Sequence, residues 1–174
     1  MAPTSPDDPT LLRALDACTQ AANVVGSVLI SLLVLLIGAD VLGRNIFGAP
    51  ISGVPEMVKL SIVAIVFLQA PQALKAGRMT RSDALINKIN ARFPKVGGSM
   101  ETLFDLLAIS VMSAIIYASY PIFIKSWTRA DFVGAMGDFT APTWPVKLMV
   151  LIGAALLLLQ FFARILRRYR KVIT

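Results

Sequence analysis

The sequence predicts an all-α membrane protein, with four transmembrane helices and one amphipathic surface helix between the second and third spans. Hydrophobic residues make up 56% of the 174 residues and charged residues only 16%, whereas a soluble domain usually carries about 25% charged residues. Four long apolar segments alternate with charged loops. With a mean hydropathy of +0.73, the chain is expected to form a single four-helix membrane domain over residues 1–174.

The first two spans are expected at about residues 19–43 and 56–76. Within the first, Ala21 to Ala39 is a run of 19 uncharged residues, which as a helix reaches about 28 Å and so nearly matches the ~30 Å hydrocarbon core. The second span has a shorter uncharged centre. Lys59 and Lys75 flank it, and their aliphatic stems are long enough to place both ammonium groups among the lipid headgroups.

The third and fourth spans are expected at about residues 101–125 and 144–166. Leu106 to Ile124 again gives 19 residues without a charge. Aromatic side chains occur at both ends of the loop that joins these spans, as expected at the membrane interface. This loop is longer than a tight turn requires, so it either anchors in the membrane or contacts a soluble partner.

The amphipathic helix is expected at about residues 80–93. Ala84, Leu85, Ile89 and Phe93 recur there at helical spacing, and charged residues largely occupy the other directions. This pattern predicts a helix that lies on the membrane surface. The alternative is a solvated loop helix.

The distribution of Lys and Arg predicts the orientation. With both termini in the cytoplasm, twelve of the 17 basic residues lie on the inner side. Five lie on the outer side: Arg44, Lys59, Lys125, Arg129 and Lys147. This bias favours cytoplasmic N and C termini. It also explains the net charge of +7 through membrane topology, so no nucleic-acid partner is expected.

Polar residues inside the spans indicate contact faces, because apolar burial gains little between helices in lipid. They follow one face in the first span, sit three residues apart in the second and recur at helical spacing in the third. The candidate packing face comprises Asn23, Ser27, Ser31, Gln69 and Gln72, and the third span adds Ser110, Ser113, Tyr117 and Tyr120. These residues pack helices within the chain or form a docking face for a larger partner.

A structural or subunit-interface charge network is expected around the first turn. It comprises Asp40, Arg44, Glu56, Lys59, Arg78 and Arg81. Asp40, at the edge of the first span, is expected to pair with Arg44 or Lys59, because an unpaired carboxylate there is costly. The alternative is a proton or ion site on Asp40. Glu101 and Asp105 form a second acidic pair, which is expected to meet Arg78 or Arg81.

The composition argues against chemistry in this chain. It has no histidine and one cysteine, Cys18, which removes the commonest metal ligand and general base and excludes an internal disulfide or a cysteine metal cluster. No nucleophile, ligand set or phosphate loop accompanies the paired acids. We therefore expect no enzyme activity, no metal and no cofactor.

The chain resembles the DctQ-type small membrane subunit of TRAP (tripartite ATP-independent periplasmic) transporters from about Leu11 to Arg168. Arg44 and Phe47 after the first span match the family, as do Glu56 and Lys59 at the start of the second. The end of that span and the start of the last span match as well, at Phe67, Leu68, Ala73, Leu74, Gly77 and Arg78 and at Thr140 to Pro145. The chain departs from the family where Ser52 to Val54 replace a tryptophan, where Glu56 is a single acid, and where Met79 replaces a histidine.

The resemblance implies a scaffold in the inner membrane of a bacterium. Such subunits brace a large membrane subunit that carries the substrate and sodium sites, and a periplasmic binding protein delivers the substrate, typically an organic acid anion. Two other functions remain open from the sequence. One is a membrane anchor of a redox enzyme, which the absence of histidine opposes. The other is a small transporter that acts alone as an oligomer.

Overall fold

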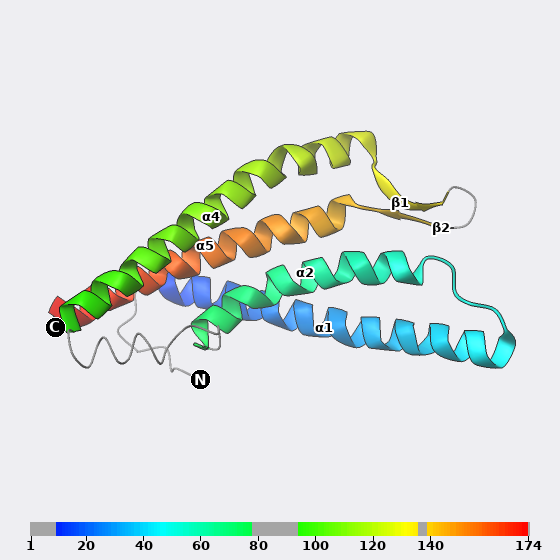
Figure 1. Ribbon diagram of the computed structural model, residues 1–174, viewed down its shortest axis with the longest axis horizontal. Helices are drawn as coiled ribbons and strands as arrows, with labels where there is room; N and C mark the ends of the chain where they lie inside the picture. The colour runs from blue at the N-terminus through cyan, green and yellow to red at the C-terminus, as the bar shows by residue number, and fades with distance from the viewer. Residues whose placement is uncertain (1–9, 78–93, 136–138, 174) are drawn as a thin grey trace.

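A computed structural model of the chain describes residues 10–77, 94–135 and 139–173 (Figure 1). These residues form four long helices and one short β-hairpin. Their bounds are α1 (Thr10–Phe47), α2 (Val54–Lys75), α4 (Pro94–Arg129), β1 (Phe132–Ala135), β2 (Phe139–Pro142) and α5 (Trp144–Ile173). All four helices are long and apolar enough to cross a membrane, which confirms the predicted fold class. The expected amphipathic helix at 80–93 falls outside the described residues, so it stays a prediction.

The helices extend beyond the apolar segments that predict them. α1 begins at Thr10, α4 begins at Pro94, and α5 continues to Ile173. Pro94 is the first residue of α4. A proline is tolerated in the first turn of a helix because the N–H groups there have no intrahelical acceptor.

The four helices lie side by side in the order α1, α2, α5, α4 (Figure 1). α2 and α5 are central and run in the same direction, whereas α1 and α4 are the outer helices. We call the end of the molecule that holds the starts of α1 and α4 and the ends of α2 and α5 the terminal end. The opposite end, with the α1–α2 turn and the β-hairpin, is the loop end.

The contact between the central helices depends on a proline and a glycine. Pro71 lies inside α2 and has no N–H, so the carbonyl of Phe67, four residues earlier, lacks its helical donor. That carbonyl oxygen faces α5 at Gly153, where an added Cβ would overlap with it. The two backbones therefore approach closely where α5 has no side chain, as is typical of helix pairs in membranes.

Apolar packing joins α5 to its other neighbour. Leu74, Leu157 and Phe161 form a buried cluster between α2 and α5. Three residues of α4 pack against the same cluster, namely Ala108, Ile109 and Met112. Ala70 of α2 packs against it as well. This core lies in the half of the molecule nearer the terminal end.

The loop end is closed by backbone turns and by a hairpin that the sequence analysis did not predict. β1 and β2 pair antiparallel, with Phe132 opposite Pro142 and Ala135 opposite Phe139. Gly53, just before α2, has a φ of +83°, and an added Cβ there would overlap with the ring of Phe139. The hairpin thus packs onto the α1–α2 turn at a position that requires glycine for both its conformation and its lack of a side chain.

We predict that Gly153→Ala destabilises the protein, because the new methyl group overlaps with the Phe67 carbonyl and pushes α5 away from α2. Overpacking of this kind costs about 1–3 kcal/mol. The measurement is the midpoint of thermal unfolding in detergent. Gly38→Ala is the matched control, because an added Cβ at Gly38 meets nothing within 4 Å. Equal midpoints for the two variants would contradict the close approach.

Candidate functional site

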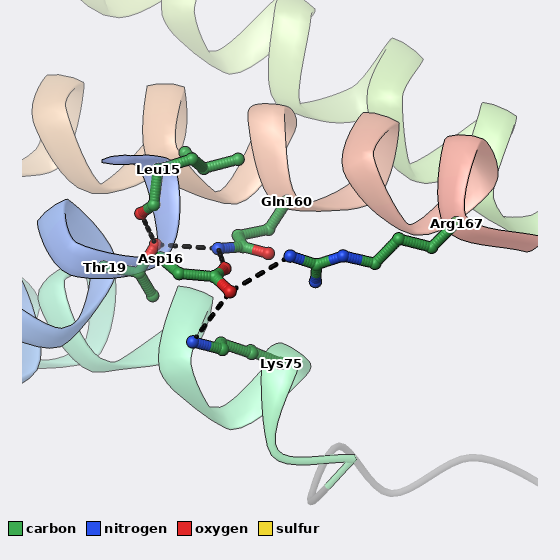
Figure 2. A network of polar contacts seen from close by, with 6 residues as sticks. All are labelled: Leu15, Asp16, Thr19, Lys75, Gln160 and Arg167. Carbon is green, nitrogen blue, oxygen red and sulfur yellow. Dashed lines mark hydrogen bonds and ion pairs between the residues drawn. The ribbon is translucent and has the colours of Figure 1, made fainter. Parts of the chain in front are cut away.

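The most extensive polar contacts in the described part of the chain lie at the terminal end, and Asp16 is at their centre (Figure 2). Asp16 is on α1, with only 4% of its surface exposed. Its Oδ2 lies 3.0 Å from Nζ of Lys75 on α2 and 3.0 Å from Nη2 of Arg167 on α5. One carboxylate therefore joins three helices.

The second oxygen of Asp16 is held by neutral donors. Nε2 of Gln160 donates to Oδ1 of Asp16 at 3.1 Å and to Oγ1 of Thr19 at 2.9 Å. The Thr19 hydroxyl in turn donates to the backbone carbonyl of Leu15 at 2.9 Å. The amide group of Gln160 thus gives both of its hydrogens to acceptors on α1. Thr19 and Gln160 are both buried.

A second charged cluster joins α4 to α5 at the same end. Asp105 on α4 is fully buried, and its carboxylate oxygens lie 3.7 Å from Nη1 of Arg164 and 3.4 Å from Nη2 of Arg168. Arg168 also pairs with Glu101 and donates to the hydroxyl of Thr102 at 3.2 Å. Arg164 and Arg168 are one turn apart on α5, on a face next to that of Gln160 and Arg167.

The two clusters bring opposite charges together around two buried carboxylates, those of Asp16 and Asp105. Three acids, Asp16, Glu101 and Asp105, meet four bases, Lys75, Arg164, Arg167 and Arg168. Removing one partner of a buried pair leaves an uncompensated charge, which costs far more than an exposed pair contributes. The arrangement is therefore suited to holding α1, α2 and α4 at fixed positions around α5.

The predicted charge network is only partly brought together. Arg44 Nη2 lies 3.0 Å from Asp40 Oδ2, and the backbone N–H of Ile51 donates to Asp40 Oδ1 at 2.8 Å. Asp40 thus closes the α1–α2 turn through a backbone group. Lys59, the alternative partner, is exposed on α2. Glu56 lies in the first turn of α2, and Arg78 and Arg81 fall outside the described residues.

The acidic pair on α4 has partners that the sequence analysis did not assign to it. Glu101 and Asp105 were expected to meet Arg78 or Arg81, but their described partners are Arg164 and Arg168. The basic tail was interpreted only as a topology signal. Its arginines are close enough to α4 to neutralise the acids because α5 continues as a helix beyond its apolar segment.

The predicted packing face divides into contacts and exposed positions. Gln69 packs against Gly26 of α1, where an added Cβ would lie 2.8 Å from Gln69 Cγ. Ser27 and Ser31 are exposed, and their hydroxyls donate to the carbonyls of Asn23 and Ser27 on their own helix, at 2.9 and 3.2 Å. The buried side of α1 instead follows Leu12, Asp16, Thr19, Ala22, Gly26 and Asp40.

Gln72 presents a different environment. Its Oε1 is buried and has no hydrogen-bond partner among the described residues. A buried amide oxygen without a donor is costly, and Pro71 directly before it distorts the same turn of α2.

The residues of the Asp16 cluster were not predicted from the sequence. A signal for them exists in retrospect. Asp16 and Thr19 continue the helical spacing that leads to Ala22 and Gly26, and Gln160 is the only polar side chain between Gly153 and Arg164. An amide inside an apolar span indicates a polar partner on a neighbouring helix.

These features define a four-span integral membrane protein whose buried polar residues connect its helices to one another. Within the described ranges, no group of three or more His, Cys, Asp or Glu side chains is arranged to hold a metal ion. A family model described as tripartite ATP-independent periplasmic transporters, DctQ component, matches residues 33–171, which is most of the chain. The chain therefore belongs to the DctQ family and is a small membrane subunit of a TRAP transporter. No curated protein and no solved structure matches it.

We predict that Asp16→Asn strongly destabilises the chain, because Lys75 and Arg167 then face each other without their shared carboxylate. Breaking a buried pair in this way costs about 3–5 kcal/mol. The measurement is again thermal unfolding in detergent. Lys75→Gln in the Asp16→Asn background is expected to restore part of the loss by removing one of the two unbalanced cations.

The control for this prediction is Asp131→Asn at the loop end. The Asp131 side chain is 43% exposed and lies 3.7 Å from Lys147, and exposed pairs contribute only about 0–1 kcal/mol. A loss at Asp131 as large as the loss at Asp16 would show that the buried cluster is not the principal connection between the helices.

Proposed function

We propose that this subunit braces the large permease subunit of its transporter, which takes up an organic acid by sodium coupling after a periplasmic binding protein delivers it. The observation that carries the bracing role is the exposure of the spans. The helices form an open layer and leave wide surfaces uncovered, above all on α4. Apolar side chains exposed along its length include Leu103, Leu107, Val111 and Ile122.

The two charged clusters at the terminal end also support the bracing role. A brace must keep its helices at fixed relative positions while a neighbour moves. Asp16 holds α1, α2 and α5 together, and Asp105 holds α4 to α5. Because Asp16 and Asp105 are buried and each contacts two bases, rearranging the clusters requires the separation of several opposite charges at once.

The partners in this proposal follow from the family. A DctQ component implies a large permease and a periplasmic binding protein. The buried charged residues described in this chain, Asp16, Asp40 and Asp105, are engaged in joining helices or closing a turn. The proposal therefore assigns sodium and substrate binding to the other components.

We predict that the chain co-purifies with the large permease subunit of its own system and that uptake in proteoliposomes requires both together with the binding protein. An inward sodium gradient is expected to drive uptake of an organic acid, and its removal is expected to abolish uptake. Proteoliposomes that contain only this chain should show no uptake. Uptake by the chain alone would overturn the bracing role and favour a self-sufficient transporter.

We also propose the orientation with both termini in the cytoplasm and the loop end in the periplasm. In a Cys18→Ser background, Phe47→Cys is expected to react with a membrane-impermeant thiol reagent applied to spheroplasts, because Phe47 is 80% exposed at the loop end. Thr174→Cys is expected to react only after permeabilisation. The reverse labelling pattern would contradict the proposed orientation.

A further inference from the structure

We infer that one face of α4, the tyrosine face formed by Ser110, Ser113, Tyr117 and Tyr120, is the surface on which a transmembrane helix of the large permease subunit packs. This inference rests on the proposed function and names the part of the chain that carries it. Hydrogen-bonding groups that face lipid inside the bilayer require a partner.

The tyrosine face is polar and uncovered. Its residues are spaced three, four and three apart, which places them on one side of a helix. All four are exposed, Tyr117 by 83% and Tyr120 by 60%. Among the described residues their hydroxyls have no hydrogen-bond partner. The exposed serines of α1 differ, because Ser27 and Ser31 donate to carbonyls of their own helix.

A backbone acceptor lies on the same turn. Pro121 is inside α4, and because it has no N–H, the carbonyl of Tyr117 lacks its helical donor. At Phe67 of α2 the equivalent carbonyl, freed by Pro71, lies against a neighbouring helix at Gly153. On α4 the freed carbonyl belongs to Tyr117, the more exposed of the two tyrosines.

Tyr117, with its hydroxyl and its freed carbonyl, lies near the middle of the membrane span formed by α4. Asp105 lies near the terminal end of α4, and Trp127 packs edge-on against Trp144 at the loop end. The two residues are about 33 Å apart along a helix, close to one hydrocarbon thickness. Tyr117 lies about 18 Å from the first and about 15 Å from the second. Its hydroxyl cannot reach either interface at that depth, and lipid chains offer no hydrogen bond. A protein partner is therefore required.

The partner that fits is a helix with hydrogen-bonding side chains and small residues opposite the two rings. Such a helix donates to the Tyr117 carbonyl and accepts from the hydroxyls, and small residues let it approach. α4 is an outer helix whose extensive helix contacts are with α5 alone, so this side is open. A second copy of the chain fits less well, because equivalent Tyr117 rings would meet at the same depth and keep the helices apart.

The test is site-specific photocrosslinking in membranes that contain the large permease subunit. The photoreactive residue p-benzoylphenylalanine is placed at Tyr117 and, as a matched control, at Val34 of α1, which is 62% exposed. We expect an adduct between this 18.8 kDa chain and the large subunit from Tyr117, and several-fold less adduct from Val34. An adduct of twice the chain's own mass, or a stronger adduct from Val34, would overturn the inference.

A second measurement separates this inference from the proposed function. The double variant Tyr117→Phe, Tyr120→Phe removes only two hydroxyls, and Ser27→Ala, Ser31→Ala removes two on α1. We expect the tyrosine variant to reduce affinity for the purified large subunit about tenfold and the serine variant to leave it unchanged. If the unaltered chain does not bind the large subunit, the proposed function fails. If it binds and the tyrosine variant binds equally well, only this inference fails.

Discussion

The arrangement of the helices depends on one carboxylate in an apolar setting. Asp16 is almost fully buried on a helix that is otherwise mostly apolar, and its charge must be balanced where water cannot do so. Lys75 and Arg167 supply that balance from two other helices, and Gln160 and Thr19 complete the hydrogen bonds. Because Lys75 and Arg167 lie far along the chain from Asp16, on α2 and α5, the cluster determines how α1, α2 and α5 meet.

A second constraint acts in the bilayer between the same helices. Hydrophobic burial adds little to helix association in lipid, so close backbone contact and hydrogen bonding must provide it. Pro71 and Gly153 bring the backbones of α2 and α5 together at the Phe67 carbonyl, and the Asp16 cluster holds the ends of the same helices. The two features act at different depths, so the central pair is fixed against both separation and rotation.

The sequence was sufficient for the fold class and insufficient for most of the polar contacts. Four apolar segments predicted four spanning helices, because the hydrocarbon thickness sets a minimum length that is read directly from the residues. The partners of Asp16 and Asp105 were not predictable in this way. Their identity depends on how far each helix continues beyond the membrane and on which helices are neighbours, and neither follows from hydropathy. Asp40 and Arg44 lie one turn apart, so their pairing needed only local geometry, whereas the Asp40 contact with the Ile51 N–H required the path of the turn.

The distribution of polar groups separates what the chain does for itself from what it offers to others. At the terminal end, the carboxylates of Asp16, Glu101 and Asp105 are held by bases on neighbouring helices. Along α4, by contrast, the four residues of the tyrosine face are exposed, and Pro121 leaves the Tyr117 carbonyl without its helical donor. The terminal-end clusters thus pair opposite charges within the chain, whereas the tyrosine face carries hydroxyl groups that the described part of the chain does not use. Their presence there is explained when α4 is an inner helix of a larger assembly and the open layer is one part of it.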